Sequence, residues 1–195
     1  DGEYHALYLN PGRLPFRDAA APSRLAEHTR PYVGWGVRLV DYDNDGNLDL
    51  FIVNGHLHEM ISRSNRAVSY REPPLLLAND GHARFTRIDA GPVFRNAYLG
   101  RGMATGDFDN DGWPDVYVAV DSMPSLLFHN NQDGTFSEIG LISGCAYNEY
   151  ARAQAGMGLG IGDFNADGWL DIFKTHFQDD TPVLFQNNGD GNFSD

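Results

Sequence analysis

The sequence predicts an all-β fold in which four-stranded sheets follow one another along the chain. An acidic loop with glycine at its sixth position occurs three times, beginning at Asp41, Asp107 and Asp163. A Gly-x-Gly pair precedes each loop, and a stretch rich in β-branched and aromatic residues follows it. The loops begin 66 and 56 residues apart, and such a period with four strands is typical of propeller blades. We therefore expect a β-propeller with about three and a half blades in this chain.

Each repeat is expected to contribute four short strands in the same order. The first carries the Gly-x-Gly pair, at residues 34–36, 100–102 and 156–158. The second follows the acidic loop, at Leu50–Val53, Val116–Val120 and Ile172–Thr175. The third is aliphatic and has an asparagine just beyond it, at Leu75–Leu77, Leu126–Phe128 and Val183–Phe185. The fourth carries a phenylalanine after an Asp-Gly hairpin signal, at Phe85, Phe136 and Phe193.

The recurring order of strands divides the chain into a half blade and three blades. The expected limits are residues 1–18 for the half blade and 19–90, 91–143 and 144–195 for the blades. The best helix candidate covers residues 19–30. Because a closed propeller needs at least four blades, we expect a part of a larger propeller, or edge strands that something else covers.

The three loops have the composition of a calcium site. Oxygen-bearing side chains recur at loop positions 1, 3, 5 and 9, and calcium takes six to eight oxygen ligands. The predicted ligands are Asp41, Asp43, Asp45 and Asp49 with the Asn47 carbonyl, then Asp107, Asp109, Asp111 and Asp115 with the Trp113 carbonyl, then Asp163, Asn165, Asp167 and Asp171 with the Trp169 carbonyl. About three Ca²⁺ ions are expected. The third site should be the weakest, because Asn165 replaces a carboxylate.

Two other interpretations of the acidic residues fail. An EF-hand needs a glutamate at position 12, where this chain has Ile52, Val118 and Lys174. Much of the net charge of −13 lies in the loops, and no basic stripe is present to neutralise phosphates, so nucleic-acid binding is not expected. No apolar run reaches the length of a membrane span.

The repeat resembles a known family. The pattern Gly-x-Gly-x4-Asp-[Tyr/Phe]-[Asp/Asn]-x-Asp-Gly-x2-Asp, with the later aliphatic-Asn-x5-Phe, is similar to the FG-GAP/VCBS repeat of integrin α-type calcium propellers. Residues 31–36, 53–56, 70–75 and 123–128 resemble the ASPIC/UnbV (cartilage acidic protein-like) group. The resemblance implies a secreted or surface-exposed adhesion or recognition module with structural calcium and no common enzymatic activity. Seven blades are typical of the family, and this chain has fewer.

Other candidate sites have simpler interpretations. His56–Glu59 lies in the one long insertion of the repeat and is our best candidate for a surface that contacts a partner. Gly156–Gly162 does not fit a nucleotide-binding loop. Cys145 is expected to be a small buried side chain, and the glycosylation sequon at Asn192 to be a chance match.

No catalytic constellation can be identified, so we expect a protein that is not an enzyme. The first hypothesis is a calcium-binding recognition or adhesion module that is secreted or on the cell surface, with the periplasm as a further compartment. Its partner would be a protein or a glycan. The alternatives are a structural subunit of a fibre or surface layer that self-associates through blade edges, and a calcium-dependent glycan-binding or carbohydrate-active protein.

Overall fold

Three four-stranded antiparallel sheets make up most of the computed structural model, which describes residues 2–195. The first contains β3 (Gly34–Val40), β4 (Asp49–Asn54), β5 (Leu75–Asn79) and β6 (Phe85–Ile88). The second contains β7 (Gly100–Gly106), β8 (Asp115–Val120), β9 (Leu126–Asn130) and β10 (Phe136–Glu138). The third contains β11 (Gly156–Gly162), β12 (Asp171–His176), β13 (Val183–Asn187) and β14 (Phe193–Ser194). The expected all-β fold and the expected order of strands are confirmed.

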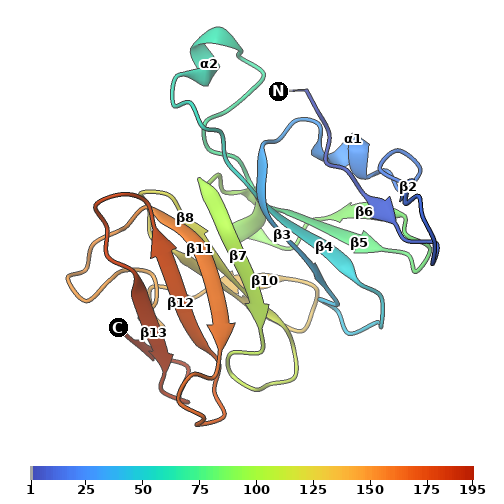
Figure 1. The fold of residues 1–195 in the computed structure, drawn as a ribbon. Coiled ribbons are helices and arrows are strands. Elements are labelled where there is room, and N and C mark those ends of the chain that lie inside the picture. Colours follow the sequence, from blue (N-terminus) through green and yellow to red (C-terminus); the bar gives the residue numbers. More distant parts are fainter. Residues whose placement is uncertain (1) are drawn as a thin grey trace.

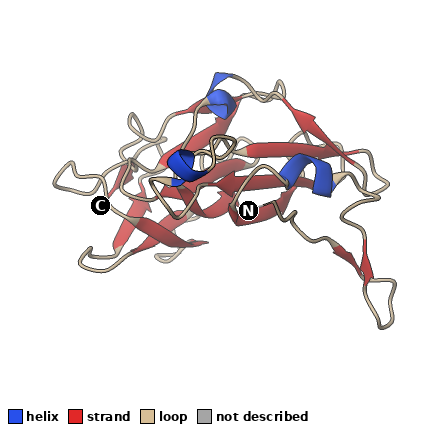
Figure 2. Ribbon diagram, turned by 90° about the horizontal axis from the view of Figure 1, so that it is seen from above, coloured by secondary structure: helices blue, strands red, loops and turns tan. Residues whose placement is uncertain are grey.

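The remaining elements are short. A two-stranded sheet pairs β1 (Tyr8–Leu9) with β2 (Arg17–Asp18). The helices are α1 (Leu25–Thr29), α2 (Ile61–Ser64) and the 3-10 helix η1 (Pro92–Arg95), and they lie apart from one another among the strands (Figure 2). The helix expected over residues 19–30 is shorter than predicted. Arg24 has a left-handed backbone (φ 66°), so the helix begins only after it.

The glycine-bearing strands of the three sheets lie next to one another, with β7 between β3 and β11 (Figure 1). A Cβ atom on Gly36 would lie 2.7 Å from the carbonyl oxygen of Arg101, and one on Gly102 would collide with the carbonyl oxygen of Met157. Any side chain at these two positions would push neighbouring sheets apart. The recurring Gly-x-Gly pair is therefore explained by close backbone approach between sheets.

Two hydrophobic clusters fill the spaces between successive sheets. The first and second sheets enclose a group of aromatic rings that includes Phe51, Phe94 and Phe128. The second and third sheets enclose Tyr117 and Phe185, whose ring centroids are 6.4 Å apart. Of the recurring phenylalanines, Phe136 is buried in the first cluster and Phe193 in the second, and Phe85 is buried in a third cluster between α1 and the first sheet. All three therefore pack in the interior.

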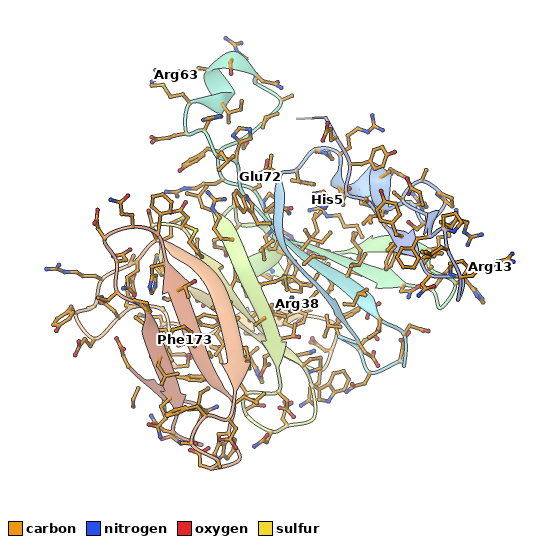
Figure 3. The ribbon with its side chains drawn as sticks, in the orientation of Figure 1. His5, Arg13, Arg38, Arg63, Glu72 and Phe173 are labelled. Carbon is orange, nitrogen blue, oxygen red and sulfur yellow. The ribbon has the colours of Figure 1, made fainter. Side chains whose placement is uncertain are left out.

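The outer face of the third sheet is only partly covered. Phe173 is 44% exposed and Leu184 is 37% exposed. The corresponding residues of the second sheet, Tyr117 and Leu127, are buried against the third sheet. Figure 3 shows Phe173 on the third sheet.

Lys174 is a buried cation at a position that is aliphatic in the other two sheets. Its side chain is 1% exposed, donates to Ser125 Oγ at 3.0 Å and lies 5.1 Å from the centroid of the Phe185 ring. The register places Ile52 and Val118 at the same point of their sheets. Burial lowers the pKa of Lys174 to about 8, because a low-dielectric site disfavours the charged form.

Replacing this lysine should stabilise the protein in a pH-dependent way. We expect Lys174→Ile, which copies the first sheet, to raise the free energy of unfolding by about 1–3 kcal/mol at pH 7. Between pH 8 and about 10.5 the unfolded chain binds more protons at Lys174 than the folded chain does, so the wild type gains stability as pH rises. The advantage of the variant should therefore shrink over this range. Urea unfolding at pH 7 and pH 10 measures it, and an equal difference at both pH values would contradict the assignment.

Candidate metal centres

The three acidic loops lie at one edge of the sheets, each between the first and second strand of its sheet. They connect β3 to β4, β7 to β8 and β11 to β12, and Figure 1 shows them together at the lower edge. The insertion that contains α2 rises from the opposite edge. The sequence repeat thus places three similar groups of carboxylates side by side.

Each loop folds around its first aspartate. Asp41 accepts hydrogen bonds from the backbone N–H groups of Asp45 and Gly46, both at 3.0 Å. Asp107 and Asp163 accept the same pair of bonds in their loops. The glycines at position 6 have φ between 88° and 92°, which explains why glycine is needed there.

The carboxylates of the first two loops converge enough to hold a cation. The ligand atoms of Asp41, Asp43 and Asp45 lie within 4.8 Å of one another. The same is true of Asp107, Asp109 and Asp115 in the second loop. These groups contain only oxygen donors, which is the chemistry that a hard cation such as Ca²⁺ requires. The residues present therefore fit the metal expected from the sequence.

The third loop differs from the other two in the way the sequence suggests. Among residues 2–195 it supplies no comparable group of three His, Cys, Asp or Glu side chains. The amide nitrogen of Asn165 donates to Asp167 Oδ2 at 2.7 Å, where the other loops have carboxylates at both positions. That the third site is the weakest stays a prediction.

The residues at position 7 also lie within the loops. The backbone N–H groups of Asn47, Trp113 and Trp169 donate to the aspartate at position 5 over 2.7–2.9 Å. A Cβ atom on Gly189 would lie 2.7 Å from the Trp169 ring, so this ring packs on the hairpin of its own sheet. Coordination by the three carbonyl groups stays a prediction.

The aspartate at position 9 joins the loop to the third strand of its sheet. Asp115 Oδ2 accepts from the N–H of Phe108 (3.2 Å), and Oδ1 accepts from the N–H of Asn130 (2.9 Å). Asp49 and Asp171 make the same two bonds. Burial raises the pKa of Asp49 and of Asp115 to about 6, and a cation bound beside them would favour the ionised form.

The asparagine that ends the third strand connects one sheet to the loop of the preceding sheet. Asn130 Nδ2 donates to the carbonyl oxygen of Tyr42 in the first loop at 2.8 Å. Asn187 Nδ2 donates to the carbonyl oxygen of Phe108 in the second loop, also at 2.8 Å. The sequence shows that this asparagine recurs, but its partner lies 88 residues away for Asn130 and 79 residues away for Asn187, and is visible only in the structure. Of the bonds described for Asn79, none reaches another sheet.

Comparisons with known proteins agree with this architecture. Residues 107–174, from the second loop to the strand after the third, match a family model described as an FG-GAP-like repeat. This part of the chain is therefore similar to an FG-GAP-like repeat. The expected resemblance to the cartilage acidic protein group is also confirmed, because cartilage acidic protein 1 is similar in two organisms.

The similarity covers small parts of longer proteins. Cartilage acidic protein 1 of Homo sapiens is 34% identical over 73 residues, which are 37% of this chain and 10% of the relative. That of Mus musculus is 25% identical over 141 residues, which are 72% of this chain and 21% of the relative. A solved structure of an Agrocybe aegerita lectin, reported as recognising non-reducing terminal N-acetylglucosamine, has a TM-score of 0.53 at 18% identity. It covers 97% of this chain and 45% of the lectin chain, and it shows likeness of fold alone.

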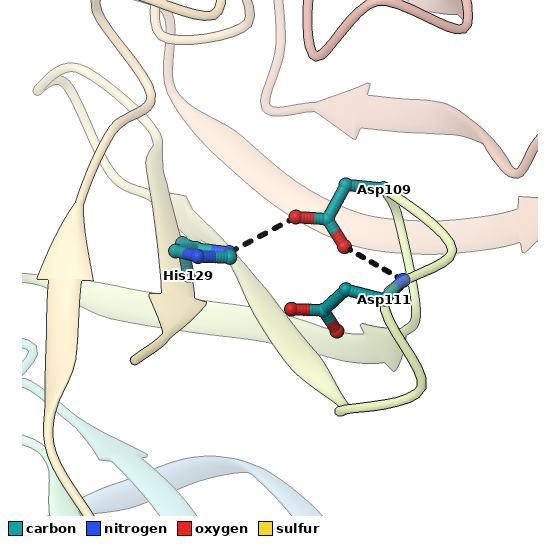
Figure 4. A group of neighbouring side chains, drawn as sticks. All are labelled: Asp109, Asp111 and His129. Atoms are coloured by element: carbon teal, nitrogen blue, oxygen red, sulfur yellow. Dashed lines mark hydrogen bonds and ion pairs between the residues drawn. The ribbon is translucent and has the colours of Figure 1, made fainter. Parts of the chain in front are cut away.

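The second acidic loop has a feature that sequence analysis missed. His129 Nδ1 lies 3.3 Å from Asp109 Oδ2 and 3.2 Å from Asp115 Oδ1. Figure 4 shows the imidazole ring facing the carboxylates of Asp109 and Asp111. The register shows the signal that could have found it: Ala78 and Gln186 occupy this place in the other sheets, one residue before the recurring asparagine.

The other candidates from the sequence have structural roles or lie at the surface. Residues 156–162 form β11 and no nucleotide-binding loop. Cys145 is buried, and burial raises the pKa of its thiol to about 12. In the insertion, His56 is buried and its Nδ1 accepts from the N–H of His58 at 2.9 Å, whereas His58 and Glu59 are exposed. Asn192 is exposed in the last hairpin. None of the helices among the described residues has the length and hydropathy that a membrane span requires.

The inter-sheet asparagine bond can be tested with a matched pair of variants. Asn130→Ala should lower the free energy of unfolding by about 1–3 kcal/mol, because it leaves the Tyr42 carbonyl unpaired in a buried site. Asn79→Ala removes the same side chain where it has no described inter-sheet bond, so it should cost less. Chemical denaturation of both variants measures the difference. Equal costs would mean that the bond between sheets contributes nothing of its own.

Proposed function

We propose that this chain is a calcium-binding recognition module that works outside the cell, either secreted, on the cell surface or in the periplasm, and that it has no catalytic activity. The observation that carries the proposal is the set of three oxygen-rich loops at one edge, two of them hydrogen-bonded to the following sheet. Calcium bound there would stiffen the joints between sheets. Millimolar calcium outside the cell suits such loops better than the cytosol does.

We infer that the sheets are blades of a β-propeller. The limits expected from the sequence, residues 19–90, 91–143 and 144–195, each contain one complete four-stranded sheet. Phe164 in the third loop is 58% exposed, whereas its counterparts Tyr42 and Phe108 are buried by a following sheet. A further blade against the third sheet would cover Phe164 together with Phe173. In this arrangement the chain forms part of a larger ring.

The metals in this proposal are structural. A cation present at about 100 times its dissociation constant stabilises the state that binds it by about 2.7 kcal/mol. Three such sites would contribute as much as the whole free energy of unfolding of a small domain, about 5–15 kcal/mol. The module would thus be rigid where calcium is abundant and would loosen where it is scarce.

Removing calcium should lower the thermal stability of the chain substantially. We expect the melting temperature in EDTA to fall by more than about 10 °C relative to millimolar Ca²⁺, because about 1 kcal/mol moves it by about 2–4 °C in a chain of this size. The double variant Asp43→Asn, Asp109→Asn should show a smaller calcium-dependent shift. Scanning calorimetry of both proteins measures this. A melting temperature that does not respond to calcium would exclude the structural metal role.

A second candidate function is glycan binding at a groove beside β3. The groove has a volume of about 470 Å³ and is lined by Trp35, Arg38, Arg101 and Met157, among others. Trp35 is 43% exposed, and its ring is held by a bond from Nε1 to the carbonyl oxygen of Gly55 (2.7 Å) and by Arg101 at 4.5 Å from the ring centroid. A fixed, exposed aromatic ring beside cationic side chains suits the apolar face of a sugar with an acidic group. The lectin of similar fold is what brings this candidate forward.

Arg38 offers a way to test glycan binding without disturbing the core. Arg38 lies on β3 with its side chain exposed (Figure 3), so Arg38→Ala should keep the fold. If the groove binds acidic glycans, a glycan array should show ligands for the wild type, and calorimetry should show at least about tenfold weaker binding by the variant. Arg152→Ala, an exposed charge far along the chain, is the control. Identical array profiles for the wild type and Arg38→Ala would exclude this groove.

A further inference from the structure

The second loop contains a nitrogen donor that the other two loops lack. The ligand atoms of Asp109, Asp111 and His129 lie within 4.8 Å of one another and form a group distinct from the all-oxygen set of Asp107, Asp109 and Asp115. Asp109 belongs to both groups. The loop therefore offers a mixed nitrogen and oxygen donor set as well as an oxygen set.

We propose that the second loop binds a divalent first-row metal ion such as Zn²⁺, with His129 Nδ1, Asp109 and Asp111 as protein ligands. The first and third loops, with Ala78 and Gln186 at the corresponding place, take only hard cations. This inference refines the metal role proposed for the loops. It does not require that the second loop also bind calcium.

The chemistry of the donors supports a transition metal. Imidazole nitrogen suits Zn²⁺, Cu²⁺, Fe²⁺ and Ni²⁺, whereas Ca²⁺ is bound by oxygen. Two ligands that are each about 2.0–2.1 Å from a tetrahedral Zn²⁺ are about 3.3 Å apart. His129 Nδ1 lies 3.3 Å from Asp109 Oδ2 and 3.2 Å from Asp115 Oδ1. These separations suit a direct ion pair and also suit two ligands of one zinc ion.

Neighbouring hydrogen bonds hold the donors in place. Asp109 Oδ1 accepts from the N–H of Asp111 at 3.2 Å, which leaves Oδ2 directed at His129 (Figure 4). Gln132 Nε2 donates to Asp111 Oδ2 at 2.8 Å. Bonds of this kind orient metal ligands and raise affinity. His129 is itself on β9, a central strand of the second sheet, and is paired with Ser137 of β10.

The test compares zinc and calcium binding by the wild type with binding by two variants that copy the sister repeats. His129→Gln copies the third sheet and His129→Ala copies the first. Calorimetric titration of the chain with Zn²⁺ should show one site that weakens at least about tenfold in both variants. Titration with Co²⁺ should show the visible absorption of a nitrogen-ligated ion in the wild type and its loss in the variants. Calcium affinity should change by less than about threefold, because the imidazole is not a calcium ligand.

A gain-of-function variant guards against a simple loss of folding. Ala78→His places an imidazole at the same register beside Asp43 and Asp45, and it should add a second Co²⁺ site with the same absorption. The other histidines are unchanged in all three variants, so the weak zinc binding they contribute is common to every titration. Far-ultraviolet circular dichroism confirms that each variant is folded.

The outcomes separate this inference from the proposed function. Zinc binding and Co²⁺ absorption that survive in His129→Gln would overturn the inference, whatever calcium does. A loss of calcium affinity as large as the loss of zinc affinity would also overturn it, since His129 would then stabilise the loop in general. If calcium fails to bind any loop while zinc binding depends on His129, the calcium function falls and the inference stands.

Discussion

A buried carboxylate bonded to two backbone N–H groups is the interaction on which each sheet depends. One N–H belongs to the acidic loop and the other to the end of the third strand, so Asp49, Asp115 and Asp171 each join three consecutive segments at one point. Two charge-assisted bonds of this kind are stronger than neutral ones. The loops can therefore keep nearly the same backbone path in all three repeats, although their exposed residues differ. The asparagine whose N–H group bonds to this aspartate also donates from its side chain to the loop of the preceding sheet, at Asn130 and Asn187. The aspartate and the asparagine together therefore connect two sheets.

Sequence reasoning could predict what is local and periodic. The Gly-x-Gly pair, the run of β-branched residues and the Asp-Gly turns each indicate a strand or a hairpin through the nearest neighbours alone. The helix over residues 19–30 was predicted too long because Arg24 has a left-handed backbone, which no residue pattern in this segment indicates. Contacts between sheets were not predictable. Asn130 recurs in sequence, but nothing in a single sequence says that its amide faces Tyr42.

The same limit explains how the candidate site was only partly predicted. The acidic residues lie within nine residues of one another, and their spacing predicts metal binding. His129 lies on another strand and has no spacing that links it to Asp109, so only the antiparallel register of β8 and β9 brings the two together. Lys174 is a similar case, since an isolated lysine within a strand pattern gives no sign that it is buried. Both residues stand where the sister repeats have ordinary side chains, and a comparison of repeats by register would have singled them out.

The acidic loops and the long insertion lie at opposite edges of the sheets. All three acidic loops lie at one edge, and the insertion around α2, which makes the first repeat longer, leaves from the other. Residues can be added at the second edge without altering the spacing of any carboxylate. A connection at that edge can be lengthened while the edge with the acidic loops keeps the same dimensions. The longer connection between β4 and β5 therefore lengthens the first repeat without changing its acidic loop.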